Sequence, residues 1–407
     1  MKQDTIRAID RSVGRPLCAI LTLVRFIAVF FGWRAPAPPR KILFLKLIEQ
    51  GATVLAHGAI RAACRRVGRE NVYFLVFEEN RFIVDLLDVI PRENVIALRH
   101  TSFLRFLADC AGALLAIRRL GIDTTIDMEF FARATAIFAF LSGARWRVGL
   151  HRFNSEGPYR GDLLTHRLQH NPYLHVSQQY RALVDALDED PRDVPLGKRV
   201  VPFEPPPVFT PSQAEKDEVR AIVAKAAGEP GKPFVLLNPN AGDLLPLRRW
   251  PDERWVELGK RLLEDPKTLV AITGAPSEAA GAEALSRALG SPRAISLAGK
   301  TTLRQVIVLY TIADLLVTND SGPGQFSALT EIKSIVIFGP ESPKAFGPRG
   351  PGSNVLSADL ACSPCVSPYN HRFSPCNNPV CMHSITVESV LEKARAVLAP
   401  PRPEPRT

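Results

Sequence analysis

The sequence predicts an α/β fold made of two Rossmann-like domains. From Lys41 onward, short apolar runs alternate with amphipathic stretches, a pattern typical of βαβ units that build a parallel sheet. The alternation stops at "VPFEPPPVFTP" (201–211), which contains five prolines, and then starts again. A chain of 407 residues with 46% hydrophobic residues is long and apolar enough for two domains, each with its own core.

The first domain is expected over 41–200. Its strands are predicted at "KILFLKLI", "VYFLVF" and "TTIDME", and its helices at "VLAHGAIRAACRRV" and "ARATAIFAFLSG". The proline-rich segment 201–211 cannot continue as a helix or a central strand, and we interpret it as an interdomain linker.

The second domain is expected over 212–395. Its strands are predicted at "FVLLNP", "TLVAITG", "ADLLVTN" and "SIVIFG", and its helices at "DERWVELGKRLLE", "EAAGAEALSRAL", "LRQVIVLYTI" and "GQFSALTE". The tail 396–407 ends in "PPRPEPRT" and is predicted to be disordered, because it holds too few apolar residues for a core.

The N-terminal segment 1–40 differs from the rest of the chain. "PLCAILTLVRFIAVFFGW" (16–33) is almost wholly apolar and is interrupted by Arg25. This run is short for a helix that spans a membrane, and we favour an interfacial anchor whose Arg25 reaches the lipid headgroups. A single span, a helix packed on the protein and a cleaved signal peptide are the alternatives. "APAPPR" (35–40) would then be a stiff spacer.

The formal net charge of +10 suits an anionic membrane or a phosphorylated substrate. The basic residues are scattered among acidic ones and form no block with interleaved aromatic residues. We therefore expect no nucleic-acid partner.

Four loops of the second domain follow its strands, where parallel α/β sheets bind their ligands. Glycines and hydroxyl residues before a helix expose backbone N–H groups to an anion, and the helix dipole assists. Arg248 and Lys300 could add full positive charge, so that the loops suit a diphosphate, and Asp320 or Glu278 could bond to sugar hydroxyls. Each loop alone is also compatible with an ordinary β-to-α turn. The other candidate donor-binding residues in these loops are Asn240, Ala241, Gly242, Gly299, Ser321, Gly322 and Gln325.

Several stretches of the chain resemble family 9 glycosyltransferases, the lipopolysaccharide heptosyltransferase group. In the second domain these are "LNPNAG", "RRWPDERWVELGKRL", "LAGKTTLRQVIVLYTIADLLVTNDSGPGQFSAL" and "IFGPESPKAFGP". In the first they are "KILFLKLIEQGATVLAHGAIRAA" and "DTTIDMEFFARATAIFAFLSGARWRVGL". The resemblance runs from about 41 to 395, and "NDSGP" is its most specific part.

The resemblance implies a GT-B architecture, in which two Rossmann-like domains face a cleft. It also implies inverting, metal-independent transfer of a heptose or another hexose-like unit from a nucleotide-sugar to a lipid-linked glycan such as lipopolysaccharide core. Without a metal, protein groups must balance the leaving diphosphate, and we assign this role to Lys300, Arg248 and the amides around Ser321 and Gly322. Such an enzyme would work at the cytoplasmic face of the inner membrane, beside anionic lipid.

The first loop departs from the family pattern at the position of the general base. The family usually carries an aspartate three residues before the loop glycine, where this chain has Ile48, and the acidic position after the glycine is Ala52. Glu49 is the nearest carboxylate, in the loop with Gln50 and Gly51, and we predict it as the base. The alternative is that Glu49 only fixes the loop and that the base lies elsewhere or activity is lost.

A second departure is Gln325, where the family commonly has histidine; it weakens an assignment of ADP-heptose as the donor. Two further functions stay open: a nucleotide-sugar epimerase of the same architecture, and a catalytically silent, membrane-associated protein that binds nucleotide-sugars.

Four cysteines cluster near the C-terminus in "CSPCVSPYNHRFSPCNNPVC": Cys362, Cys365, Cys376 and Cys381. A C-x2-C pair followed by C-x4-C is compatible with a tetrahedral zinc site. Unpaired thiols, disulfides or another metal are the alternatives. A structural zinc ion would stabilise the fold, and no cofactor is expected for catalysis.

Overall fold

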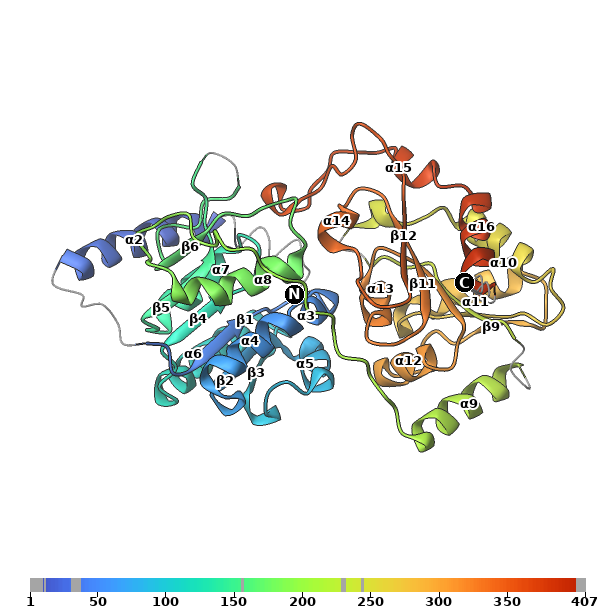
Figure 1. The fold of residues 1–407 in the computed structure, drawn as a ribbon, viewed down its shortest axis with the longest axis horizontal. Helices are drawn as coiled ribbons and strands as arrows, with labels where there is room; N and C mark the ends of the chain where they lie inside the picture. The colour runs from blue at the N-terminus through green and yellow to red at the C-terminus, as the bar shows by residue number, and fades with distance from the viewer. Residues whose placement is uncertain are drawn as a thin grey trace, which may run out of the picture. The chain divides into compact units, whose positions relative to one another are not determined.

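The computed structural model describes residues 10, 12–30, 38–154, 157–227, 232–242 and 245–399. It divides into two compact units, each built around its own sheet (Figure 1). Unit 1 contains the chain up to Pro205 together with Ser367–Phe373, and unit 2 contains Pro206–Val366 and the chain from Ser374. Most of the predicted tail 396–407 and half of the predicted spacer 35–40 lie outside the described residues.

Unit 1 holds a six-stranded parallel sheet in the order β3-β2-β1-β4-β5-β6. The strands are almost wholly buried, as expected for a parallel sheet covered on both faces. Their bounds are β1 (Ile42–Leu45), β2 (Val72–Phe77), β3 (Val95–Leu98), β4 (Thr124–Asp127), β5 (Trp146–Leu150) and β6 (His166–Leu168).

Seven α-helices surround this sheet in the described part of unit 1. They are α2 (Gly14–Phe30), α3 (Gln50–Leu55), α4 (His57–Val67), α5 (Arg81–Leu87), α6 (Phe103–Arg119), α7 (Arg133–Leu141) and α8 (Val176–Asp185). Helices α6 and α7 share one core with residues of β1 and β2, so they cover the same face of the sheet. Helix α2 packs on α7, and α4 packs on α8.

Unit 2 repeats the design with the strand order β12-β11-β10-β7-β8-β9. The strands are β7 (Phe234–Asn238), β8 (Leu269–Ile272), β9 (Ala294–Ser296), β10 (Leu315–Asn319), β11 (Lys333–Phe338) and β12 (Ser353–Ser357). The helices are α9 (Gln213–Ala227), α10 (Asp252–Leu262), α11 (Ala279–Ala288), α12 (Leu303–Tyr310), α13 (Gly322–Ser327), α14 (Pro343–Phe346), α15 (Val380–His383) and α16 (Val387–Leu398).

Two tryptophans anchor the last helix of unit 2 to its core. The rings of Trp250 and Trp255 meet edge to face with centroids 5.1 Å apart, and both side chains are fully buried. The indole N–H of Trp250 donates to the carbonyl of Ile385 at 2.8 Å, just before α16. The buried aromatic pair therefore ties "RRWPDERW" to the C-terminal segment.

The α/β fold with two Rossmann-like sheets is confirmed. The predicted helix "VLAHGAIRAACRRV" is interrupted, since α3 ends at Leu55 and α4 begins at His57. The predicted helix "GQFSALTE" is shifted: α13 begins earlier, at Gly322, and ends earlier, at Ser327. The early start is possible because Pro323 fits the first turn of a helix, where its missing N–H is not needed.

None of the described helices is long and apolar enough to cross a bilayer. The apolar N-terminal run forms α2, which lies along α7 (Figure 1). Cys18 of α2 is buried against Ala136 of α7, and Arg25 of α2 forms an ion pair with Asp162. One side of α2 is thus packed on unit 1.

Candidate active site

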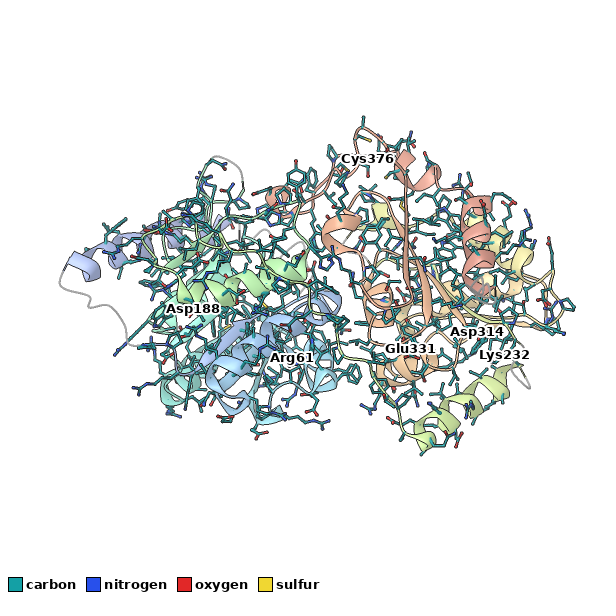
Figure 2. The ribbon with its side chains drawn as sticks, viewed as in Figure 1. Arg61, Asp188, Lys232, Asp314, Glu331 and Cys376 are labelled. Atoms are coloured by element: carbon teal, nitrogen blue, oxygen red, sulfur yellow. The ribbon has the colours of Figure 1, made fainter. Side chains whose placement is uncertain are left out.

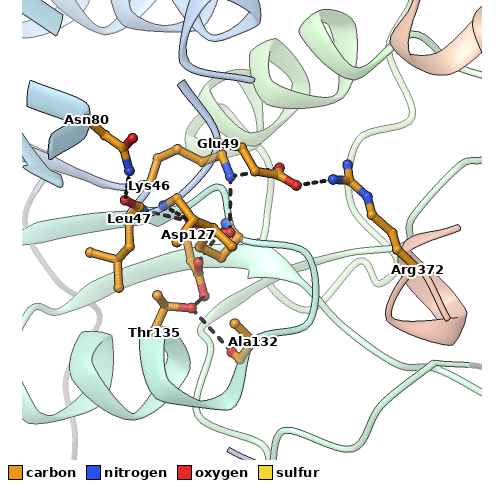
Figure 3. A network of polar contacts seen from close by, with 10 residues as sticks. Lys46, Leu47, Glu49, Asn80, Asp127, Ala132, Thr135 and Arg372 are labelled. Atoms are coloured by element: carbon orange, nitrogen blue, oxygen red, sulfur yellow. Dashed lines mark hydrogen bonds and ion pairs between the residues drawn. The ribbon is translucent and has the colours of Figure 1, made fainter. Parts of the chain in front are cut away.

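Glu49 lies just beyond the carboxyl end of β1, at the start of α3 (Figure 3). Its carboxylate contacts two cations: Oε1 pairs with Arg372, and Oε2 lies 3.4 Å from Nζ of Lys46. Arg372 belongs to Ser367–Phe373, the segment near the C-terminus that is part of unit 1. Glu49 also has φ of 68°, a left-handed conformation that is costly for a residue other than glycine. Its position is therefore imposed by its surroundings.

A second carboxylate supports the loop that carries Glu49. Glu129 Oε2 lies 3.1 Å from Nζ of the fully buried Lys46, and Glu129 Oε1 accepts hydrogen bonds from the backbone N–H of Leu47 at 2.8 Å and Ile48 at 3.1 Å. Burial, the largest single influence, would lower the pKa of Lys46, but the combined effects of Glu129, Tyr180 and Glu49 outweigh it, and the pKa is raised. Lys46 therefore stays charged and holds both carboxylates.

Asp127, at the end of β4, lies beneath this network. It pairs with the buried Arg160 and accepts hydrogen bonds from the Thr135 hydroxyl at 2.9 Å and from the backbone N–H of Glu129 at 3.0 Å. Burial raises the pKa of Asp127, while Arg160 opposes that shift. Asp127 thus fixes the turn on which Glu129 sits.

The other predicted residues of this loop have structural partners. The side-chain amide of Gln50 donates to the carbonyl of Glu79 at 2.8 Å, and Gly51 is buried in α3. Ile48 is 40% exposed and Ala52 is buried, so neither position supplies a polar group. Glu49 is the carboxylate that this loop presents.

Sequence reasoning missed Lys46, Glu129 and Arg372. A lysine inside the apolar run "KILFLKLI" was a signal for the first, because a buried lysine needs a partner. The acidic residues of "TTIDME" were a signal for the second. Nothing in the local sequence links Arg372 to Glu49, which lies 323 positions earlier.

In unit 2, the structure brings Arg248, Asp320 and Ala241 together at the ends of β7 and β10. Arg248 Nη1 lies 3.5 Å from Asp320 Oδ2, and Nη2 donates to the carbonyl of Ala241 at 3.1 Å. The neighbouring Arg249 Nη2 is 3.5 Å from the carbonyl of Gly242. Asn319 fixes these loops. Its side-chain N–H donates to the carbonyl of Pro239, and its side-chain oxygen accepts a hydrogen bond from the backbone N–H of Trp250.

A second group surrounds Gly274, at the end of β8. A Cβ atom at this glycine would lie 3.0 Å from Glu278 Oε2 and 3.1 Å from Asn240 Nδ2, so both predicted side chains face the same point. The backbone N–H of Gly299, which has φ of 70°, donates to the carbonyl of Gly274 at 3.1 Å. The loops after β7, β8 and β9 therefore converge here.

The remaining predicted donor-loop residues bond within unit 2. Nζ of Lys300 donates to the carbonyl of Ser296 at 3.0 Å, and the hydroxyl of Ser321 donates to the carbonyl of Asn319 at 3.1 Å. In the described part of the chain, Lys300 shares no hydrogen bond or ion pair with Arg248 or Ser321.

Two residues of the fourth loop lie in α13. Gly322 is its first residue. The amide nitrogen of the buried Gln325 donates to the carbonyl of Phe346 at 2.6 Å, while its Oε1 has no hydrogen-bond partner among the described residues.

The four C-terminal cysteines form no disulfide bond within the described residues. Cys376 is exposed on the loop before α15 (Figure 2), and Cys381 is buried. Burial raises the pKa of Cys381, and Cys365, Cys376 and Cys362 add to that shift, so the four thiols lie in one region. No group of three or more His, Cys, Asp and Glu among the described residues is arranged to hold a metal ion. The zinc site stays a prediction.

The sequence model of glycosyltransferase family 9 (heptosyltransferase) matches residues 115–372, more than half of the chain. The chain belongs to glycosyltransferase family 9. This confirms the resemblance seen in the sequence, and it places the donor-loop residues of unit 2 inside the matched region.

Curated relatives of this family 9 protein are heptosyltransferases. Lipooligosaccharide heptosyltransferase 2 of Campylobacter jejuni is 33% identical over 104 residues, 25% of this chain and 31% of that protein. The enzyme of the same name from Haemophilus influenzae is 28% identical over 213 residues, 51% of this chain and 59% of that protein. The chain therefore matches only part of the length of these relatives, from about a third to three fifths.

Solved structures share the fold over most of this chain. The E. coli ADP-heptose lipopolysaccharide heptosyltransferase II has a TM-score of 0.67 at 19% identity, covering 88% of this chain and 98% of that one. The family 9 glycosyltransferase of Veillonella parvula has a TM-score of 0.66 at 16% identity, covering 89% and 97%. At these identities the likeness shows the fold, and it confirms the GT-B type of α/β architecture for the family 9 protein.

Proposed function

We propose that this family 9 protein is an inverting, metal-independent glycosyltransferase that moves a heptose or another hexose-like unit from a nucleotide-sugar to a lipid-linked glycan such as lipopolysaccharide core. Family membership and the heptosyltransferase relatives support the reaction class. The single observation that carries the mechanism is the carboxylate of Glu49, fixed at the end of β1 by Lys46 and Arg372.

Glu49 would act as the general base. It would take the proton from the acceptor hydroxyl as that oxygen forms a bond to the anomeric carbon of the donor. The bond from this carbon to the diphosphate breaks in the same step, so that the nucleoside diphosphate leaves with the electron pair and the anomeric configuration inverts. Two cations beside Glu49 favour its ionised form before proton transfer.

The loops of unit 2 would hold the donor. Arg248, Lys300 and the backbone amides around Ser321 and Gly322 would balance the charge of the leaving diphosphate without a metal ion. Asp320 and Glu278 would accept hydrogen bonds from sugar hydroxyls. The pairing of Arg248 with Asp320 at 3.5 Å supports this proposal, because it keeps both side chains at the strand ends.

ADP-heptose is the first donor to test. An E. coli heptosyltransferase of similar fold was solved with ADP (TM-score 0.60, 16% identity) and with ADP-2-deoxy-2-fluoro heptose (TM-score 0.58, 17% identity). Gln325 stands where the family commonly has histidine. Because this difference weakens the assignment of ADP-heptose, other nucleotide-sugars should be tested as donors as well.

The proposed location is the cytoplasmic face of the inner membrane, with anionic lipid as a partner and α2 as an interfacial anchor. The side of α2 that faces away from α7 supports this location, since it exposes Ile20, Leu23, Val24, Phe26 and Ile27. A helix with one apolar, outward side can lie in the headgroup region of a bilayer.

Calorimetric titration with ADP-, UDP-, GDP- and CMP-sugars tests the donor, and mass spectrometry of a lipid-linked acceptor tests transfer. We expect one nucleotide-sugar to bind and the acceptor to gain the mass of one sugar. An isomerised or free sugar without acceptor modification would favour the epimerase. Binding without any turnover would favour the silent protein, the alternative raised by Ile48 and Ala52.

A further inference from the structure

Helix α6 carries a second outward apolar stripe in unit 1. Phe103, Leu104, Leu107 and Leu115 are between 46% and 78% exposed, and their spacing places them along one side of the helix. Only Ala113 and Ile117 of α6 are fully buried. Single exposed apolar residues are ordinary on protein surfaces, but a stripe of this kind is typical of an interaction site.

The stripes of α2 and α6 lie on the same face of the sheet. Helices α6 and α7 share the core that contains Leu43 and Leu75, and α2 packs on α7. The end of α6 is also joined to the end of α7, because Arg118 Nη2 donates to the carbonyl of Leu141 at 2.6 Å. Leu141 itself is 38% exposed. The two stripes therefore flank one helix.

The charge of this face is positive. The described part of α2 contains no acidic residue, and its two arginines are Arg15 and Arg25, of which Arg25 is paired with Asp162. Helix α6 contains Arg105, Arg118 and Arg119 and a single acid, Asp109. That acid is neutralised by Arg99, whose Nη2 lies 2.8 Å from Asp109 Oδ1. Arg105 and Arg119 are exposed.

We propose that unit 1 docks on an anionic lipid bilayer through α2 and α6 together. This inference rests on the membrane association proposed above and assigns α6 to it. The apolar stripes would enter the interfacial region, and the arginines at the ends of α6 would meet the lipid phosphates. Two helices that flank α7 would fix the orientation of unit 1 on the membrane. With a single helix at the surface, unit 1 could still rotate about the axis of that helix.

A bilayer fits this face better than a second copy of the chain. A twofold dimer brings the same patch of both copies together, so that Arg105 and Arg119 of one copy would approach those of the other. Like charges near an apolar contact oppose association, whereas an anionic surface neutralises them.

Flotation of the full-length protein with vesicles tests the proposal. The vesicles contain either phosphatidylcholine alone or phosphatidylcholine with phosphatidylglycerol. Replacing Leu104, Leu107 and Leu115 by serine should weaken binding to the anionic vesicles by about tenfold or more. Replacing Arg105 and Arg119 by glutamine should weaken that binding by about tenfold and leave binding to neutral vesicles unchanged.

Matched variants separate the outcomes. L23S/I27S tests α2, and Y173S/V200S removes two exposed apolar side chains of unit 1 outside both helices and should bind as the wild type does. Thermal unfolding establishes that each variant is folded.

If the α6 serine variant binds the vesicles as the wild type does and the α2 variant does not, the proposed role of α6 is overturned. Helix α2 alone would then be the membrane anchor. A change of oligomeric state in light scattering without lipid, with vesicle binding intact, would assign the face to self-association instead. Transfer to a detergent-solubilised acceptor is measured separately, so a failure of docking and a failure of the proposed activity are distinguishable.

Discussion

The end of β1 in unit 1 is occupied by charged side chains that pair with one another, whereas the strand ends of unit 2 are formed by side chains that bond mainly to backbone carbonyls. In unit 1, Lys46 and Arg372 contact Glu49, and Lys46 also contacts Glu129. In unit 2, Lys300 donates to the carbonyl of Ser296, and Arg248 donates to that of Ala241.

This difference corresponds to two tasks. A network of buried ion pairs is costly to assemble, but it holds one carboxylate in one place, as proton transfer to a single atom requires. Loops anchored through backbone bonds leave glycines and N–H groups to face a larger anion. The comparison supports the proposal that the base lies in unit 1 and that the diphosphate binds in unit 2, and the following predictions test that division in order of decreasing effect.

Removing the charge of Glu49 should have the largest effect. E49Q keeps the shape of the side chain but cannot accept the proton, and we expect kcat to fall by about 10²- to 10⁴-fold. Donor affinity, measured by calorimetry, should stay within about twofold, because Glu49 lies in unit 1. Transfer by E49Q at the wild-type rate would remove the assignment of the base.

E78Q is the matched control for this variant. Glu78 follows β2 and is exposed, so its replacement should leave kcat unchanged.

Truncating Lys300 should have the next largest effect. K300A removes a positive charge from the proposed diphosphate loops, and we expect kcat/KM to fall by about 10²- to 10³-fold. Unlike E49Q, this variant should also bind the donor more weakly. The exposed Lys344, also in unit 2, provides the control K344A, which should behave as the wild type. Unchanged donor binding by K300A would contradict the placement of the diphosphate.

Truncating Arg372 should have a smaller effect, because Lys46 still contacts Glu49. R372A is expected to lower kcat by about tenfold, and R372K should restore much of the loss. The acid limb of the pH–rate profile should move to higher pH, since a carboxylate that loses a neighbouring cation takes up a proton more readily. A purely structural role for Arg372 would lower activity without moving this limb. F373S, a change at an exposed neighbour, should leave the profile intact.

The sequence predicted the strands of both sheets better than the side-chain contacts at the ends of those strands. The runs "VYFLVF" and "ADLLVTN" are β2 and β10, because buried parallel strands are recognisable as continuous apolar segments. Glu49 was found because it is close to the loop glycine in sequence. Arg372 was not, since its partner is 323 positions away and no local pattern encodes such a pair.

The ion pair at the strand ends of unit 2 could not be predicted from the sequence either. Arg248 and Lys300 were both predicted as diphosphate ligands, yet only Arg248 contacts Asp320. Which of two cations pairs with a given acid depends on the path of each loop, and periodicity does not determine that path.

The last prediction concerns stability and has no effect at neutral pH. Four histidines of unit 1 have a pKa lowered by burial from 6.5 to about 4: His57, His151, His166 and His170. Each is neutral when folded but takes up a proton near pH 6.5 when unfolded, so its stabilising contribution is complete above that value and is lost as the pH falls toward 4. In unit 2, Arg304 lowers the pKa of Glu215 to about 2, and that contribution is lost only below the usual value of 4.5.

Lowering the pH from about 8 to about 5 should therefore destabilise unit 1 by the order of 1 kcal/mol per histidine and leave unit 2 nearly unchanged. Pulse proteolysis in urea, with fragments assigned to each unit by mass spectrometry, measures the two free energies of unfolding separately. H166F keeps an aromatic ring against Trp146, which stacks on His166 with centroids 4.7 Å apart, and should reduce the pH dependence of unit 1 alone. Equal destabilisation of both units at about pH 5 would mean that the buried histidines do not set the acid sensitivity, and the chemical contrast between the two units would then be confined to the ends of their strands.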